Sequence, residues 1–301
     1  MFTRLSPNIQ AILFAVLGYA SFSVSDTMVK LLTGSYNSFQ IIGFRAFIIT
    51  TLFVIIAPKL GGFKRTFKTK KLKVHIARGL SNTTLLLLIT AGLAKLDLPE
   101  FYTIIFFTPF ITTILARIFF KEHINAHGMF AIILGFLGVL TVVRPGVGVF
   151  NPWLLLPFAA TFFIAALCLL VKPLDKDETM LSFALYPTLS NIVLVSLPML
   201  VLYDIPTITD WPYFLISAIT ATTGLIFSAI AYRKAKACIV APIQYSQILW
   251  GIAFGALIFH QTPDVWTLAG ASIIIGAGLY LLYSENGRSV SYTHLTLPTK
   301  A

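Results

Sequence analysis

The sequence predicts an all-α integral membrane protein whose ten transmembrane helices form two inverted five-helix repeats. Three observations predict this fold. First, 57% of the 301 residues are apolar, only 11% are charged, and the mean hydropathy is +0.87, whereas about one-quarter of the residues in a soluble domain are charged. Second, the apolar residues form runs of about 20, the length at which a helix crosses the hydrocarbon layer. Third, short sequence patterns recur between the two halves of the chain.

Ten apolar runs define the expected helices. The runs are continuous and lack a two-residue alternation, which favours helices over the strands of a membrane barrel. Short loops join them, so no room is left for a soluble domain. The expected spans cover residues 9–32, 39–58, 76–94, 99–120, 128–143, 153–171, 179–202, 211–232, 239–259 and 264–283.

Two echoes indicate that the second half repeats the first. Val29-Lys30-Leu31-Leu32 recurs as Val171-Lys172-Pro173-Leu174, and Phe120-Lys121-Glu122 recurs as Phe259-His260-Gln261 ahead of glycine-rich spans five and ten. We interpret those glycines as sites of close helix packing. Because five crossings are an odd number, the second copy is inverted relative to the first.

We therefore expect a first repeat over residues 1–147, a second repeat over residues 148–284 and a tail over residues 285–301. The tail is polar from Ser289 onward and resembles translated adapter sequence, so we interpret its last part as non-native and exclude it from the fold.

The loops predict the orientation in the membrane. With the N-terminus inside, nearly all Lys and Arg residues of the loops fall on the cytoplasmic side, and the outer loops hold only Lys95 and Arg144. This asymmetry predicts that both termini are cytoplasmic in a bacterial inner membrane. It also explains the net charge of +11 without nucleic acid as a partner.

The motifs that are missing narrow the function. No phosphate-binding GxxxxGK[ST] loop is present, so no ATP-driven pump is predicted. Inverted repeats are typical of secondary transporters, whose sites lie near the midplane of the membrane. A membrane enzyme would need clustered catalytic carboxylates or histidines, and a receptor or structural protein would have no aqueous cavity. We expect no cofactor and no metal.

Ionisable residues inside the apolar runs are the first candidates for function, because burial in lipid costs each of them about 2.5–3.5 kcal/mol. Asp26 and Arg45 both lie about 9 Å below the outer ends of their spans at 1.5 Å per residue, so adjacent antiparallel helices could pair them. Lys30 is one turn from Asp26 and could join the pair or extend outward. A structural ion pair and a substrate- or proton-linked role both stay open. Arg78 and Arg117 are interpreted as reaching outward to lipid phosphates.

Polar and aromatic residues form a second group of candidates. A glutamine that faced lipid would leave its amide unsatisfied, so we expect Gln244, Gln247 and Asn82 to face a cavity. Flat aromatic surfaces can hold a ring or a cation. The alternative is hydrogen bonding between helices with an aromatic belt, which we favour for Tyr186 and Asn191. The remaining candidates of this group are Tyr102, Tyr245 and Trp250.

The layout resembles the EamA proteins of the drug/metabolite transporter superfamily over about residues 8–285. The resemblance depends on the five-plus-five arrangement, on the stretch PFITTILARIFFKE from Pro109 to Glu122, and on the glycine-rich spans five and ten. It implies ten helices, a central cavity lined mainly by spans 1, 3, 4, 6, 8 and 9, and alternating access.

Several stretches are similar to the S-adenosylmethionine uptake transporters of intracellular bacteria: Ser25 to Lys30, Phe44-Arg45, His75 to Leu80, Phe150-Asn151-Pro152, Ala241-Pro242 with Tyr245, and Leu282 to Glu285. The chain departs from that pattern at Gln244, Gln247 and Gln261, where the pattern carries charged residues.

The expected function is secondary transport of small amphipathic metabolites, with S-adenosylmethionine uptake as the sharpest hypothesis and export of amino acids or drugs as the alternative. Asp26 is then the coupling or cation-binding carboxylate, and Arg45 is its partner or an anchor for a substrate carboxylate. The expected partners are a small-molecule metabolite and membrane lipid, with a coupling proton and a second copy of the chain as further candidates.

Overall fold

The computed structural model describes residues 7–60, 66–67, 69, 71–121, 126–143, 151–170, 178–235 and 240–293. Within these ranges the chain is helical and contains no strand. Eight helices are long and apolar enough to span a membrane, and two shorter apolar helices complete the ten expected crossings.

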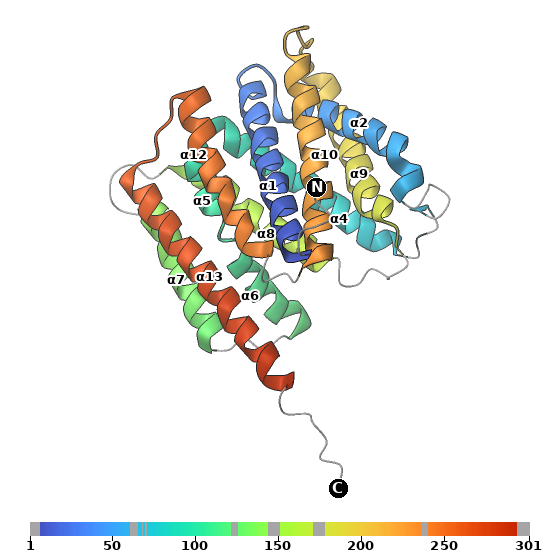
Figure 1. Ribbon diagram of the computed structural model, residues 1–301. Coiled ribbons are helices and arrows are strands. Elements are labelled where there is room, and N and C mark those ends of the chain that lie inside the picture. The colour runs from blue at the N-terminus through green and yellow to red at the C-terminus, as the bar shows by residue number, and fades with distance from the viewer. Residues whose placement is uncertain are drawn as a thin grey trace.

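The ten crossings follow one another as expected from the apolar runs (Figure 1). Their helices are α1 (Pro7–Leu32), α2 (Ser38–Ile56) continued by η2 (Ala57–Leu60), α4 (Leu72–Lys95), α5 (Leu98–Ile105) with α6 (Thr108–Phe120), α7 (Ala126–Val143), η3 (Pro152–Leu154) with α8 (Leu155–Leu169), α9 (Met180–Val201), α10 (Trp211–Lys234), η4 (Ala241–Tyr245) with α12 (Ser246–Phe259), and α13 (Val265–Thr293).

Three helices differ from the expected spans. The fourth crossing breaks between α5 and α6 at Phe106 and Phe107, because Pro109 has no backbone N–H to donate to the Ile105 carbonyl oxygen, which accepts from the Thr108 hydroxyl instead. In the ninth crossing, residues Ala241–Tyr245 form the 3-10 helix η4 ahead of α12. The last helix, α13, continues to Thr293, ten residues beyond its expected end.

The packing of the helices is two-fold symmetric. Helix α1 packs on α10, and the equivalent pair, α8 on α4, is also formed; likewise α12 lies on α1 and α6 lies on α8. Three pairs, α2 with α9, α5 with α12 and α7 with α13, join equivalent crossings of the two halves. Exchanging the halves therefore leaves these main pairings unchanged, which confirms two inverted five-helix repeats.

The echo between the halves extends to the backbone. Within the part of the chain that the structure describes, only two residues other than glycine have a positive φ, Lys121 and His260, and both have φ 55°. They occupy matching positions at the ends of α6 and α12, where each residue terminates its helix in the left-handed conformation.

Glycines bring α7 and α13 into close contact. A Cβ atom on Gly138 would lie 3.1 Å from the carbonyl oxygen of Gly270, and one on Gly270 would lie 2.8 Å from the carbonyl oxygen of Gly138. This confirms that glycines of spans five and ten serve helix packing. Gly276 in α13, by contrast, has no such neighbour within 4 Å.

Candidate functional site

A cavity of about 340 Å³ lies between α2, α4, α9 and α10, with contributions from α1 and α8. Most of its polar lining comes from the middle of these helices, because Arg45, Asn82, Asn191 and Thr222 lie near the centres of α2, α4, α9 and α10. The cavity therefore lies at the midplane of the helical bundle and between the two repeats, where secondary transporters hold their substrates.

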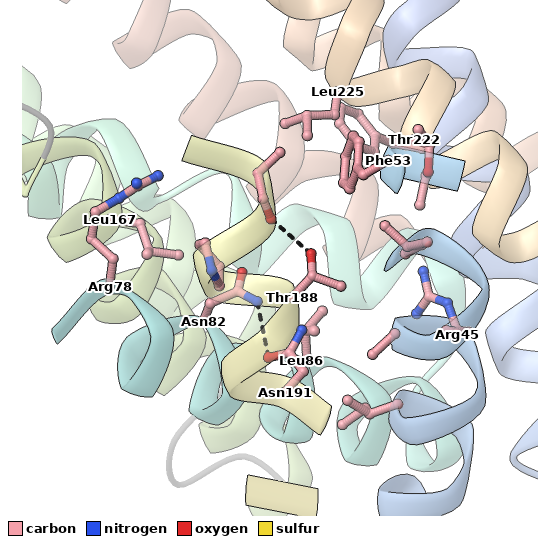
Figure 2. A pocket seen from close by; sticks show the side chains of 17 residues that line it. Arg45, Phe53, Arg78, Asn82, Leu86, Leu167, Thr188, Asn191, Thr222 and Leu225 are labelled. Atoms are coloured by element: carbon pink, nitrogen blue, oxygen red, sulfur yellow. Dashed lines mark hydrogen bonds between the residues drawn. The ribbon is translucent and has the colours of Figure 1, made fainter. Parts of the chain in front are cut away.

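An amide network forms one wall of the cavity (Figure 2). The Asn82 side-chain N–H donates to the Asn191 carbonyl oxygen at 3.1 Å, and the Thr83 hydroxyl donates to the same oxygen at 2.8 Å. Asn82 faces the cavity as its sequence context predicts. Asn191, which we interpreted as structural, both holds this network and lines the cavity.

Arg45 is turned toward α1 but does not pair with Asp26. One guanidinium N–H donates to Ser25 Oγ at 2.8 Å, and that hydroxyl donates to the carbonyl oxygen of Ser217 on α10 at 3.0 Å. Consecutive residues of an α-helix point about 100° apart. Arg45 can therefore meet Ser25 while the next side chain, Asp26, faces a different helix.

Asp26 faces α5 instead. Its carboxylate accepts a hydrogen bond from the Tyr102 hydroxyl at 2.9 Å. The Tyr102 ring is buried and lies on Gly251 of α12, where a Cβ atom would approach a ring carbon to 2.6 Å. The Asp26–Tyr102 pair thus joins α1 and α5 at a point where α12 has no side chain.

Lys30 does not join Asp26 either. Its ammonium donates to the carbonyl oxygens of Leu93 and Leu96 at the end of α4 and lies 5.3 Å from the centre of the Phe259 ring. A helix C-terminus presents unpaired carbonyls and a partial negative charge, which favour a cation there. Lys30 therefore caps α4.

The predicted residues of span nine lie away from the cavity. Tyr245 is buried against Gly278 and contacts the Phe106 ring edge-on at 5.2 Å between ring centres, and Trp250 stacks on Phe254. Gln247 is buried and Gln244 is partly buried. The candidates thus divide into a cavity group, Arg45 and Asn82, and a junction group between α1, α5 and α12 that contains Asp26, Tyr102 and Tyr245.

Arg78 is the main cavity residue that sequence reasoning missed. It was expected to reach outward to lipid, but its side chain is only 8% exposed and lines the cavity. A usable signal was present, because Arg78 and Asn82 are four residues apart and so share one face of α4. Depth measured from the helix end was a poor guide, since it ignores the face on which the residue lies.

The comparisons with known proteins agree with this architecture. The model of the EamA-like transporter family matches residues 9–144 and 151–284. The chain belongs to that family. An S-adenosylmethionine uptake transporter of Rickettsia bellii is 31% identical, with 90% of this chain and 92% of that protein covered. The corresponding protein of Rickettsia prowazekii is 28% identical over 96% of this chain and 98% of its own length.

A relative of lower identity is named as an exporter. A pseudopaline exporter of Pseudomonas aeruginosa is 23% identical, with 92% of this chain and 97% of that protein covered. One protein of known crystal structure matches with a TM-score of 0.59 over 92% of this chain and 98% of its own, at 12% identity. At that identity the similarity extends to the fold alone.

A group of hydrogen bonds closes this EamA bundle at one end, and we call it the Tyr36 clasp. It joins the α1–α2 connection to the α9–α10 connection. The Tyr36 hydroxyl donates to Asp210 at 2.5 Å and accepts from the Thr207 backbone N–H at 3.1 Å. The side chain of Asn37 donates to the Leu202 carbonyl oxygen, and that of Gln40 donates to the Asp204 carbonyl oxygen. Hydrogen bonds from Thr207 and Tyr36 hold the pKa of Asp210 below its ordinary value.

A second group, the His75 clasp, closes the other end of α2 and α9. His75 Nε2 lies 3.3 Å from the Glu178 carboxylate, and the His75 ring stacks on Tyr186 at 4.3 Å between ring centres. The Thr69 hydroxyl donates to Glu178, and the hydroxyls of Thr66 and Thr179 share a hydrogen bond at 2.7 Å. Burial opposes ionisation of Glu178, but hydrogen bonds from Thr69 and Ser182 and the nearby His75 outweigh it and lower the pKa.

The two clasps are equivalent under the repeat symmetry. The Tyr36 clasp joins the connection after crossing one to the connection after crossing seven. The His75 clasp joins the connection after crossing six to the connection after crossing two. Both clasps are formed in this structure, with the cavity between them.

Proposed function

We propose that this EamA transporter carries S-adenosylmethionine, or a metabolite of the same amphipathic kind, into the cell. The observation that carries the proposal is similarity over nine-tenths or more of the chain to proteins named S-adenosylmethionine uptake transporters. The cavity supports it, because about 340 Å³ at the midplane falls in the size range of small-molecule sites, roughly 300–1,000 Å³. The metabolite crosses the membrane without chemical change.

In this proposal the junction group provides the coupling. Asp26 is the carboxylate that binds a cation or a proton, and Tyr102 holds it in place. An ionisable residue in a membrane span is a functional candidate by default, because its burial is costly. In this structure Tyr245, Gln244, Gln247 and Trp250 lie outside the cavity. In the proposal they shape a part of the substrate path beside α12, where the aromatic rings offer flat surfaces to a substrate ring.

The proposed setting is the bacterial inner membrane with both termini in the cytoplasm, supported by the basic residues of the loops. The Tyr36 clasp then faces outward and the His75 clasp faces the cytoplasm. Each clasp is a gate of the alternating-access cycle.

The first experiment measures uptake of labelled S-adenosylmethionine by a bacterium that has no uptake of its own and that expresses the full chain. Asp26→Asn is expected to abolish accumulation, because an amide can neither release a proton nor neutralise a cation. Asp97→Asn is the matched control, since Asp97 precedes α5 and its side chain makes no capping hydrogen bond. The accumulated label must also be recovered as unmodified S-adenosylmethionine.

The possible results separate the parts of the proposal. Accumulation that survives Asp26→Asn would keep the substrate and assign Asp26 a structural role. Absence of accumulation by a well-expressed wild type would contradict uptake. Export is the second candidate, because a pseudopaline exporter is similar over 92% of this chain. Loss of label from preloaded cells would then identify the direction.

A further inference from the structure

The charge of the cavity is unusual for a site that would bind a cation. Two of its lining side chains are the guanidinium groups of Arg45 and Arg78, and its other polar groups are amides and hydroxyls. No Asp or Glu is among the described residues that line it. Asp26 on α1 accepts a hydrogen bond from Tyr102 and is not part of the lining.

Arg45 makes no direct ion pair within the described part of the chain, although Asp26 acts on its charge electrostatically from beyond contact distance. It is 9% exposed, it donates one hydrogen bond to the neutral Ser25 hydroxyl, and its Nε has no hydrogen-bond partner. No carboxylate of the described residues lies within ion-pair distance of it. A buried guanidinium that no carboxylate contacts directly is costly, and a carboxylate that docks on it relieves that cost through two parallel hydrogen bonds.

Arg78 lies across the cavity from Arg45, with Asn82 and Asn191 between them (Figure 2). It is 8% exposed and interacts electrostatically with Glu178, which Thr69 and His75 already hold in the His75 clasp. A ligand in the cavity therefore meets a positive charge on each side and amide groups in the middle.

We propose that this cavity is a carboxylate subsite, in which Arg45 binds the carboxylate of the transported metabolite and Arg78 contributes to selection of that negative charge. This inference depends on the proposed function, since it assigns the substrate class of the same transporter. It commits the chain to metabolites that carry a carboxylate, such as amino acid derivatives. Amines of similar size that lack the carboxylate are rejected.

The test compares two ligands that differ by the carboxylate alone, S-adenosylmethionine and decarboxylated S-adenosylmethionine. Their binding to the purified full chain in lipid nanodiscs is measured by calorimetry. Wild type is expected to bind S-adenosylmethionine at least about tenfold more tightly, the scale of one charge-assisted bidentate contact. Arg45→Gln and Arg78→Gln should each weaken that ligand and leave the decarboxylated ligand unchanged.

Lys95→Gln is the matched control, because it removes one positive charge from a residue that lies over the Trp153 ring and does not line the cavity. It should leave the discrimination intact. Equal binding of both ligands by wild type would overturn the proposal. So would an equal loss of both ligands in the arginine variants, which is the result expected if the arginines only hold the helices together.

A failure of the uptake proposal can be distinguished in the same assay. If neither adenosyl compound binds, methionine is compared with methioninamide and glutamate with glutamine. Preference for a carboxylate that is lost in Arg45→Gln would retain the subsite for a different metabolite. Binding of none of these probes would contradict the carboxylate subsite itself.

Discussion

Ser25 and Asp26 show how two adjacent residues of one helix can serve two different parts of the molecule. Ser25 receives Arg45 at the cavity, and Asp26 receives Tyr102 at the junction between α1, α5 and α12. The two groups are thus linked through neighbouring backbone positions of α1. Binding of a carboxylate at Arg45 and a change of charge at Asp26 would act on the same turn of helix.

Tyr102→Phe tests the junction, because it removes the hydroxyl that donates to Asp26 and leaves the ring that lies on Gly251. Hydrogen bonds to charged groups contribute about 1.5–3 kcal/mol, so uptake is expected to fall by roughly tenfold or more at equal amounts in the membrane. Tyr213→Phe, on the partly exposed face of α10, should have no effect. Unchanged uptake in Tyr102→Phe would show that Asp26 works without this hydroxyl.

His260 offers a test of backbone strain. Its φ of 55° is the left-handed conformation, which costs residues with a Cβ atom about 1–2 kcal/mol. His260→Gly is expected to raise the free energy of unfolding by about 1 kcal/mol in a detergent unfolding series. His260→Ala retains the Cβ atom and should bring no such gain. Equal stability of the glycine and alanine variants would contradict the conformational explanation.

At the scale of single residues the sequence predicted which side chains were costly in lipid but not their partners. The depths of Asp26 and Arg45 made a pair plausible, yet pairing depends on the rotation of each helix about its axis. Rotation is set by tertiary packing, here by the contact of the Tyr102 ring with Gly251 and by the hydrogen bond from Ser25 to α10. The same uncertainty explains why Arg78 was missed. Its position near the helix end suggested contact with lipid phosphates, but it lies on the face of α4 that lines the cavity.

The helices α7 and α13 are elements whose association depends on the absence of side chains. Gly138→Ala is expected to lower stability, because the new methyl would lie 2.6 Å from Ile274 Cγ1 and 3.1 Å from the Gly270 carbonyl oxygen. Gly276→Ala is the matched variant, since its Cβ meets nothing within 4 Å, and it should gain about 1 kcal/mol of helix propensity. Thermal unfolding of the two purified variants checks the opposite signs. A gain of stability in both would contradict the close crossing.

Breaks within the crossings were harder to predict than the crossings themselves. The run from residue 99 to residue 120 is predominantly apolar on both sides of the break, so hydropathy gave no sign of the interruption at Phe106 and Phe107. Pro109 was a local signal, but proline also occurs within continuous helices, as Pro187 does in α9. Whether a proline breaks a helix depends on the neighbours that satisfy the freed backbone groups.

At the scale of the whole molecule, most of the fold was predictable. Ten crossings, their order and the inversion of the repeats followed from apolar runs, an odd helix number and two short echoes. The pairings of α1 with α10 and of α2 with α9 were not predictable, because they arise from packing between residues distant in sequence. The cavity depends on those pairings, which is why only Arg45 and Asn82 of the candidates line it.

The Tyr36 clasp joins the two repeats and gives stability a pH dependence. Because the pKa of Asp210 is lowered in the folded state, its stabilisation is present at neutral pH and is lost as the pH falls through that lowered pKa. Asp210→Asn is expected to lower the melting temperature by a few degrees at pH 7, and the difference from wild type should shrink on acidification. Asp204→Asn is the control, since this residue contributes its backbone to the clasp. A difference that persists at acidic pH would contradict the role of the carboxylate.

The symmetry of the Tyr36 and His75 clasps has a consequence for vectorial flux. Releasing one clasp while retaining the other gives two states that are related by the approximate two-fold rotation that exchanges the repeats. Their energies differ because the side chains of the two repeats differ, including those of the two clasps. Such a protein does not itself set the direction of transport. The concentration gradient of the substrate, together with that of any ion that binds Asp26, sets it. Import and export would then proceed through the same reversible conformational cycle.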